Sequence, residues 1–94
     1  MIRSFKSKET EKVWNGERSS KLPLEVQKVG RRKLRMLNNS IDINDLRIPP
    51  SNRLEKLSGR FAKSYSIRIN DHWRIIFKWS QGHAFEVQII DYHK

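Results

Sequence analysis

The sequence ends in a run of ionisable side chains that directly follows an apolar, strand-like stretch at residues 85–90. The run consists of Asp91, Tyr92, His93 and Lys94. A carboxylate, a phenol, an imidazole and an amine at a strand end add little beyond solubility unless that end is docked and used. The chemistry that these groups can perform is therefore the first question.

Cleavage of RNA by its own 2′-hydroxyl needs residue types that this chain contains. A base must remove the 2′-OH proton, a cation must hold the negative charge of the phosphorane, and an acid must protonate the departing 5′-oxygen. His93 can act as acid or base, Asp91 as base or as a group that orients His93, and Tyr92 as a stacking ring or a proton donor. Arg74 can hold the phosphate. On these residues alone we favour a plainer interpretation, in which the strand ends in solvated polar groups and Arg74 pairs with Asp91.

Other chemistries lack the residues that they need. The sequence has no cysteine, and His72, His83 and His93 do not have the spacing of a metal site. Its glycines are isolated, so no phosphate-binding glycine-rich loop is predicted. We expect a site that uses neither a metal nor another cofactor.

The charge of the chain points to anionic partners. Twenty Lys and Arg residues against ten Asp and Glu residues leave a formal charge of +10 on 94 residues. This field attracts polyanions, although charge alone does not distinguish nucleic acid, an anionic membrane and an acidic protein. No stretch approaches the length of a membrane span, and we expect one domain, residues 1–94, located in the cytoplasm.

Two helices are predicted in the first half of the chain. Ser7 is a candidate N-cap for the first, Gly16 would end it, and Pro23 opens the second, at residues 24–38. Plotted at about 100° per residue, the second helix gathers its apolar residues on one side, with Lys33 as an exception among them. The opposite side carries four cations, which either contact RNA phosphates or are simply solvated: Lys28, Arg31, Arg32 and Arg35.

Three strands are predicted in the second half. Two prolines favour an extended connection at residues 48–52, after which residues 64–69 and 72–79 alternate between apolar and polar side chains and form a hairpin. The final strand is expected to place three apolar residues inward: Phe85, Val87 and Ile89. Helices followed by an antiparallel meander predict an α+β two-layer domain, with the helices on one face of a small sheet.

The opposite face of this sheet is expected to be exposed and to hold the site. It would carry residues of all three strands: Arg68, Arg74, Ile76, Lys78, Glu86, Gln88, Ile90 and Tyr92. Strand alternation separates Tyr92 from Asp91 and His93. The three can therefore meet at one phosphate only if the chain turns or twists out of regular extension there.

Several blocks of the sequence, in this order, resemble the HigB toxins of the RelE superfamily, and the preceding Pro49-Pro50 resembles the GraT-type branch. The blocks are NRLEKLSG at residues 52–59, YSIRIN at 65–70, WRIIF at 73–77 and DYH at 91–93. The resemblance implies a RelE-like fold and a ribosome-dependent endoribonuclease that cuts mRNA and inhibits translation. It also implies a HigA-like helix-turn-helix antitoxin as partner, operator DNA bound only through the antitoxin complex, and no membrane association.

The resemblance also assigns site residues. The family's catalytic positions match Arg74, Asp91, Tyr92 and His93. Ser58 stands where many HigB toxins have a lysine, so no catalytic lysine is transferred to that position. The cations expected to contact RNA or the ribosome are Lys28, Arg31, Arg32, Arg35, Lys56, Arg60 and Arg68, of which Lys56 or Arg60 could replace the missing lysine.

The sequence is also compatible with two other functions. A non-catalytic ribosome- or RNA-binding module, which inhibits translation or ribosome assembly by occupancy, agrees with the charge of +10 and with Ser58. A DNA-binding component of a regulatory complex is less well supported, because no recognition helix with base-reading side chains stands out.

Overall fold

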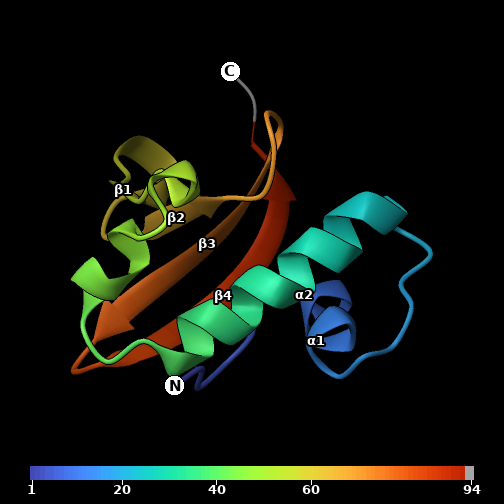
Figure 1. The fold of residues 1–94 in the computed structure, drawn as a ribbon, viewed down its shortest axis with the longest axis horizontal. Coiled ribbons are helices and arrows are strands. Elements are labelled where there is room, and N and C mark those ends of the chain that lie inside the picture. Colours follow the sequence, from blue (N-terminus) through green and yellow to red (C-terminus); the bar gives the residue numbers. More distant parts are fainter. Residues whose placement is uncertain (93–94) are drawn as a thin grey trace.

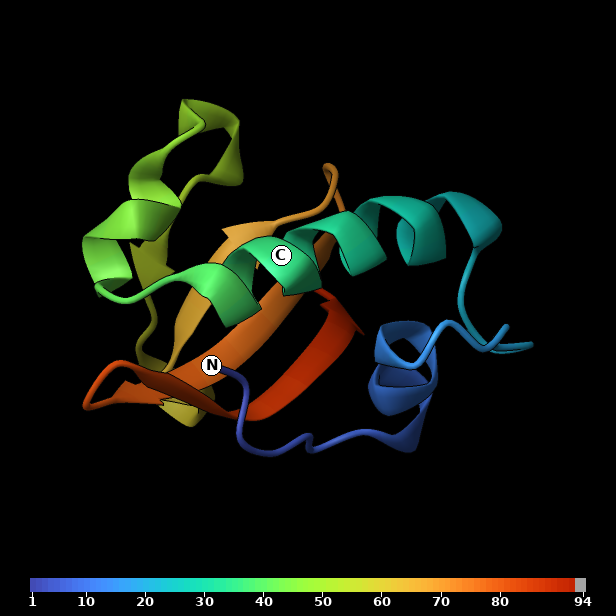
Figure 2. The ribbon, with the colours of Figure 1, turned by 60° about the horizontal axis from the view of Figure 1, so that its bottom comes forward.

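The computed structural model describes residues 1–92 and consists of two helices packed on one face of a four-stranded antiparallel sheet (Figures 1 and 2). The helices are α1 (Lys8–Trp14) and α2 (Leu24–Asn39), and the strands, adjacent in chain order, are β1 (Glu55–Lys56), β2 (Tyr65–Arg68), β3 (Trp73–Ser80) and β4 (His83–Asp91). Three short 3-10 turns, η1 (Ile43–Arg47), η2 (Pro50–Asn52) and η3 (Gly59–Phe61), connect α2 to β2 around β1. The predicted α+β two-layer architecture is confirmed.

The two helices begin and end where their sequence signals predict. The side chain of Ser7 accepts a hydrogen bond from the backbone N–H of Thr10, and the chain leaves α1 through Gly16 at a φ of 82°. Helix α2 starts directly after Pro23. It is the longest helix of the described residues, and it lies across the sheet with its apolar side inward (Figure 2).

Lys33 does not direct its amine outward, as a lysine on an apolar helix side usually does. Its side chain is only 5% exposed, and its Nζ donates a hydrogen bond to the side-chain oxygen of Asn52. Asn52 is fully buried and donates in turn to the carbonyl oxygen of Leu46 at 3.1 Å. This chain of hydrogen bonds fixes α2, η1 and η2 to one another.

The same contact explains why the connection at residues 48–52 departs from the predicted extended form. Ile48 is extended, as its position before a proline requires, but Pro50–Asn52 closes into the 3-10 turn η2. A tight turn brings the side chain of Asn52 to Lys33, which an extended segment would not do. A buried polar contact that is distant in sequence therefore overrides the local preference.

The core lies between α2 and the inner face of the sheet. Ile67 of β2 stands opposite Ile75 of β3, which stands opposite Ile89 of β4, and all three are buried. The helices add Val13, Val26, Leu34 and Leu37 to the same cluster. Burial of these side chains contributes roughly 1.5–3 kcal/mol each and fixes the sheet against the helices.

The expectation that Phe85 points inward is wrong. Glu86 adopts a φ of 51° at a β-bulge, so that Ile76 stands opposite Gln88 while Lys78 stands opposite Phe85. The extra residue reverses the alternation of β4 on its N-terminal side. Ala84 consequently takes the buried position that was assigned to Phe85, which is only half-buried and lies outside the core cluster.

The second face of the sheet is not simply exposed either. Ile76, which was expected to be exposed on that face, is 1% exposed, and Ser66, which stands opposite it on β2, is 0% exposed, because the segment around η3 folds over this part of the sheet. Arg74 and Tyr92 lie on the same face, beside the part of the sheet that the η3 segment covers. No helix among residues 1–92 has the length and apolarity to cross a membrane.

Candidate active site

Arg74 is the centre of the candidate site, and its guanidinium is fixed by several acceptors. Nη1 donates to the hydroxyl oxygen of Ser66 at 3.0 Å and to the carbonyl oxygen of Arg53 at 3.4 Å. Nη2 lies 3.3 Å from a carboxylate oxygen of Glu55. The Arg74 side chain is 14% exposed. A guanidinium held in this way presents a directed positive charge, which suits a phosphate that gains charge during reaction.

Aromatic rings stand beside this guanidinium. The guanidinium carbon of Arg74 lies 5.8 Å from the ring centre of Tyr92, and the rings of Tyr92 and Phe61 are 5.9 Å apart at a tilt of 55°. Arg60 places its own guanidinium 4.7 Å from the ring centre of Phe61. Arginine and aromatic side chains in alternation form a surface on which bases stack and phosphates bind.

Glu55 was not assigned to the site from the sequence, although it lies in one of the blocks that carry the family resemblance. It belongs to the two-residue strand β1, where it pairs with Ser66, while its neighbour Lys56 pairs with Tyr65. Because residues directly opposite each other point to the same face, Glu55 reaches Arg74 and Lys56 points to the other face. The Lys56 ammonium accordingly lies 6.0 Å from the Tyr65 ring. The sequence signal for this placement of Glu55 is the alternation of side chains along β1, but a two-residue strand is too short to be recognised from sequence.

A recess of about 110 Å³ borders the site under η3 and includes Arg60, Phe61, Ile76 and Gln88 in its lining. At its edge, Lys78 Nζ lies 2.9 Å from a carboxylate oxygen of Glu86, and this hydrogen bond and charge lower the pKa of Glu86. Lys78 is thus neutralised locally. Arg60 lies beside the Phe61 ring, which in turn contacts the Tyr92 ring, whereas Lys56 lies beside Tyr65 on the other face of the sheet.

The two described members of the C-terminal run, Asp91 and Tyr92, lie on different faces of the sheet. Tyr92 follows the end of β4 and donates its backbone N–H to the carbonyl oxygen of His72. Asp91 is exposed and stands opposite Trp73, which packs against the core, so Asp91 belongs to the face away from Arg74. His93, which the sequence predicts to be catalytic, lies outside the described residues 1–92.

The predicted RNA-contacting cations do not form one continuous surface. Lys28, Arg31, Arg32 and Arg35 are all exposed on α2, on the side of the molecule away from Arg74. Arg68 stands opposite Arg74 at the end of β2, where it forms an ion pair with Asp71. A recess of about 340 Å³ separates α2 from this strand end and is lined by Arg32, Lys33 and Arg68 among others. Among residues 1–92 no three His, Asp or Glu side chains form a group that could hold a metal ion.

Comparisons with known proteins identify the family. A family model described as "RelE-like toxin of type II toxin-antitoxin system HigB" matches residues 3–93. The chain is 37% identical to Toxin HigB-1 of Vibrio cholerae over 95 aligned residues, which cover 100% of this chain and 99% of that protein. It is also 48% identical over 67 residues to an uncharacterized protein of Haemophilus influenzae. This match covers 71% of the present chain and 66% of the Haemophilus protein.

Solved structures show the same fold. The chain is similar to a chain in the YoeB-YefM complex from Staphylococcus aureus, with a TM-score of 0.60 and 19% identity, and to one in a heterotetrameric YoeB-YefM complex from that organism, with a TM-score of 0.61 and 21% identity. Both matches cover 100% of this chain and 99% of the other. The family match over nearly the whole length decides the assignment: the chain belongs to the HigB-like family of RelE-like toxins of type II toxin–antitoxin systems.

Proposed function

We propose that this toxin is a ribosome-dependent endoribonuclease, which cuts mRNA on the translating ribosome and thereby inhibits translation. The observation that carries the proposal is the Arg74 guanidinium, fixed by Ser66, Glu55 and the Arg53 carbonyl and in contact with the Tyr92 ring. A fixed cation beside an aromatic ring and a carboxylate fits the phosphate, the base and the 2′-hydroxyl of one RNA step.

In the proposed reaction a base removes the proton of the 2′-hydroxyl, and the 2′-oxygen forms a bond to phosphorus. The bond between phosphorus and the 5′-oxygen breaks, and an acid protonates that oxygen. The products are a 2′,3′-cyclic phosphate and a 5′-hydroxyl. Arg74 holds the phosphate oxygens, Tyr92 and Phe61 stack on the flanking bases, and His93 remains the candidate acid.

Glu55 is the best candidate for the base among the described residues. Its carboxylate already contacts the phosphate-binding group, and its side chain is 48% exposed, so substrate can reach it. Asp91, the other carboxylate proposed from the sequence, belongs to the opposite face of the sheet. A phosphate bound by Arg74 would therefore place a neighbouring 2′-hydroxyl closer to Glu55 than to Asp91.

We further propose that a cognate antitoxin of the HigA-like, helix-turn-helix type binds and silences the toxin. Membership of a type II family supports an antitoxin partner. The structurally similar YoeB of S. aureus is itself found in a complex with YefM. The exposed cations of α2 are proposed to contact ribosomal RNA, which supplies the polyanion that a formal charge of +10 favours.

The test is to incubate the protein with ribosomes programmed with a defined mRNA and to map new 5′ ends. We expect cuts within the decoding region, bearing 5′-hydroxyl ends, and no cut where the nucleotide preceding the scissile phosphate is 2′-deoxy. The same mRNA without ribosomes should stay intact. If wild-type protein and a His93→Ala variant both leave the mRNA whole while still blocking translation, the alternative of inhibition by occupancy, which Ser58 favours, is correct.

A further inference from the structure

The recess under η3 has a lining that suits a planar, uncharged group. Its volume of about 110 Å³ is the space of roughly four water molecules. The Phe61 ring and the buried side chain of Ile76 contribute to its lining, and the side chain of Gln88 adds an amide. A nucleobase needs this combination, because its face packs on rings and apolar groups while its edge forms hydrogen bonds.

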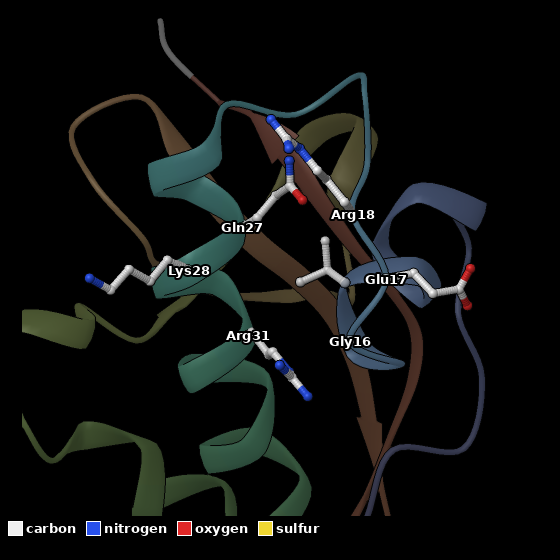
Figure 3. A pocket seen from close by; sticks show the side chains of 7 residues that line it. Gly16, Glu17, Arg18, Gln27, Lys28 and Arg31 are labelled. Carbon is white, nitrogen blue, oxygen red and sulfur yellow. The ribbon is translucent and has the colours of Figure 1, made fainter.

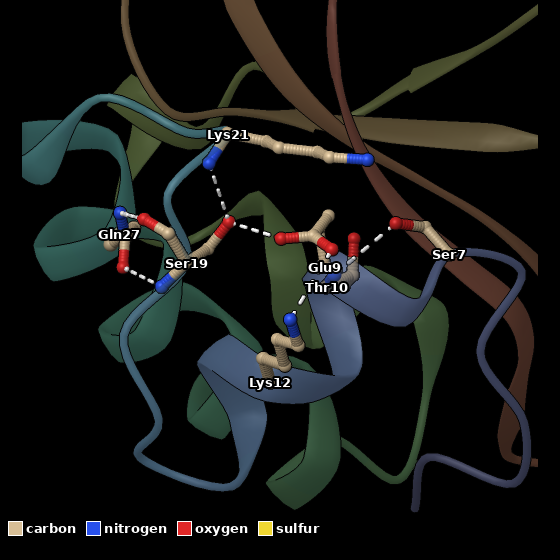
Figure 4. Close-up of polar contacts among 7 residues, drawn as sticks. All are labelled: Ser7, Glu9, Thr10, Lys12, Ser19, Lys21 and Gln27. Atoms are coloured by element: carbon tan, nitrogen blue, oxygen red, sulfur yellow. Dashed lines mark hydrogen bonds and ion pairs between the residues drawn. The ribbon is translucent and has the colours of Figure 1, made fainter.

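The side-chain amide of Gln88 is available to a ligand. Within residues 1–92 no hydrogen bond joins it to another group. Gln27 of α2 is the opposite case, because it accepts from the backbone N–H of Ser19 at 3.0 Å and donates to the carbonyl oxygens of Ser19 and Leu22 (Figure 4). The Gln27 amide therefore holds a loop in place, whereas the Gln88 amide keeps its donors and its acceptor for another molecule.

The larger recess between α1 and α2, of about 230 Å³, lacks this combination. The Lys28 side chain extends away from it, and the guanidinium groups of Arg18 and Arg31 lie at its opposite ends (Figure 3). No aromatic ring contributes to its lining, and its glutamine is Gln27, whose amide binds the loop. This recess therefore offers a base neither a stacking surface nor an available amide.

The recess under η3 lies beside the phosphate position proposed at Arg74. Gln88 of β4 stands directly opposite Ile76 of β3, and Ile76 follows Arg74 by two residues, so all three point to one face of the sheet. Two residues of a strand span roughly 7 Å. The Phe61 ring connects the two places, because it lines the recess and contacts the Tyr92 ring beside Arg74. A nucleotide attached to that phosphate can therefore place its base in the recess.

The charges around the recess favour a base over a second phosphate. Lys78 Nζ lies 2.9 Å from a carboxylate oxygen of Glu86, and the hydrogen bond and charge of Lys78, together with the charge of Lys6, lower the pKa of Glu86. These two cations therefore already compensate a carboxylate, and Arg60, the third cation of the lining, lies over the Phe61 ring. A phosphate in the recess would compete with the Glu86 carboxylate for the lysines, whereas an uncharged base would not.

We propose that the recess under η3 binds one unstacked base of the mRNA and that the Gln88 amide recognises the edge of this base. The Phe61 ring stacks on the base, while the amide donates one hydrogen bond to its edge and accepts another. Gln88 thereby determines which base is preferred next to the scissile phosphate. The inference deepens the proposed function and rests on it, because the neighbouring phosphate is the one proposed at Arg74.

The proposal is tested by NMR titration of the isotope-labelled full chain with two short strands of equal length. The first is a single-stranded 2′-O-methyl RNA that contains all four bases, and the second has the same number of phosphates but is abasic throughout. We expect the first strand to shift the side-chain amide signals of Gln88 and the abasic strand to leave them in place. The amide signals of Gln81, which is exposed on the turn between β3 and β4, serve as an internal reference.

Gln88→Leu removes the amide while keeping a side chain of similar size. In the wild type the base-bearing strand should bind more tightly than the abasic strand, and Gln88→Leu should reduce this ratio of dissociation constants by roughly fivefold or more. The ratio separates base recognition from a change in the fold, because a disturbed fold weakens the binding of both strands. Phe61→Leu is a second variant, which removes the stacking ring and should also reduce the ratio.

Equal shifts of the Gln88 amide signals by both strands would overturn the proposal in favour of a phosphate site. Gln88 signals that do not move at millimolar concentrations of the base-bearing strand would overturn it as well, as would an unchanged ratio in Gln88→Leu. No ribosome is present and the 2′-O-methyl strand cannot be cut, so the result is independent of whether the toxin cleaves mRNA.

Discussion

At the residue scale, Arg74 combines fixed geometry with limited exposure. Its side chain is 14% exposed, and both terminal nitrogens already have acceptors, so the guanidinium orientation is determined before substrate binds. Positioned charge accelerates a reaction because no reorganisation is needed when negative charge develops on the phosphorane. Arg74 is accordingly the residue on which the proposed chemistry depends most.

The role of Glu55 gives the first prediction. Glu55→Gln keeps an oxygen that can accept a hydrogen bond from Arg74 but removes the basic carboxylate. We expect the rate of mRNA cleavage on ribosomes to fall by roughly 10²–10⁴ with little change in ribosome affinity, as for the loss of a general base. Single-turnover cleavage measures the rate directly.

Glu86→Gln is the matched control for Glu55→Gln, since the Glu86 carboxylate is paired with Lys78 at the edge of the recess under η3. Its cleavage rate should stay within a few-fold of the wild-type rate. If Glu55→Gln cleaves mRNA as fast as Glu86→Gln does, Glu55 is not the general base and another group removes the 2′-hydroxyl proton.

At the element scale, α2 has two functions that its sequence pattern only partly separates. Its apolar side forms the core with β2, β3 and β4, and its exposed side carries the cations. Lys33 belongs to neither side, because it is buried and bound to Asn52. Burial, together with the positive charges of Arg32 and Arg68, lowers the pKa of Lys33.

The second prediction follows from this shift in pKa. Because the pKa of Lys33 is lower in the folded protein, the unfolded chain binds the Lys33 proton more tightly. The charged amine therefore lowers the free energy of unfolding at neutral pH. This cost disappears as the pH rises towards 10.5, the ordinary pKa of lysine, because the folded protein then loses the proton. We therefore measure the free energy of unfolding of wild type and Lys33→Met by urea unfolding from neutral to alkaline pH. The wild type should become more stable relative to Lys33→Met as the pH rises, so that the two curves converge or cross. Lys28→Met, which removes a lysine from the exposed side of α2, is the comparison for the loss of a charge outside the core. Parallel curves for Lys33→Met would contradict the shift.

The third prediction concerns the turn between β3 and β4. Gln81 and Gly82 have φ values of 50° and 80°, the pattern of a type I′ turn, in which asparagine suits the first position better than glutamine. Gln81→Asn should stabilise the protein by roughly 0.5–1 kcal/mol, a rise in melting temperature of a few degrees. Gln81→Ala serves as the control, because alanine gains nothing at positive φ. An unchanged melting temperature for Gln81→Asn would mean that the turn is not strained.

The sequence predicted the elements whose periodicity is long and regular. Helix α2 and strands β2 and β3 were placed within two residues at each end, because each has a continuous apolar side. Local chemistry also predicted the cap at Ser7, where a short polar side chain precedes the helix.

What the sequence did not predict depends on contacts between distant residues. The bulge at Glu86 changes the inward residue from Phe85 to Ala84, and nothing in the local pattern indicates an extra residue in the strand. Glu55 reaches Arg74 only because a two-residue strand pairs with β2. The catalytic hypothesis required Asp91 and Tyr92 to meet at one phosphate, but the sequence did not predict that they do. The pairing of Asp91 with Trp73 places Asp91 on the face of the sheet opposite to Tyr92.

At the scale of the whole molecule, the positive charge is divided between two faces. Arg60 and Arg74 lie on one face of the sheet with the aromatic rings, and the exposed cations of α2 lie on the helical side. This division predicts that the first group affects cleavage and the second affects affinity.

The fourth prediction tests the helical side through salt dependence. Replacing Arg32 and Arg35 together by glutamine should weaken ribosome binding and make the plot of log affinity against log salt shallower, by roughly 0.7–0.9 for each lost phosphate contact. Lys8→Gln with Lys21→Gln removes the same charge from exposed sites outside α2. If this pair changes the slope equally, net charge and not the face of α2 determines binding.

The fifth measurement tests the central claim most directly: the single-turnover rate of mRNA cleavage on saturating programmed ribosomes for wild type, Arg74→Ala and Arg35→Ala. Loss of a fixed group that stabilises the transition state typically costs 10²–10³ in rate, so we expect Arg74→Ala to cleave roughly 10²–10³ more slowly. Arg35→Ala should cleave at nearly the wild-type rate once binding is saturated. Equal rates for Arg74→Ala and the wild type would contradict the account, because they would remove the phosphate contact around which the site is built.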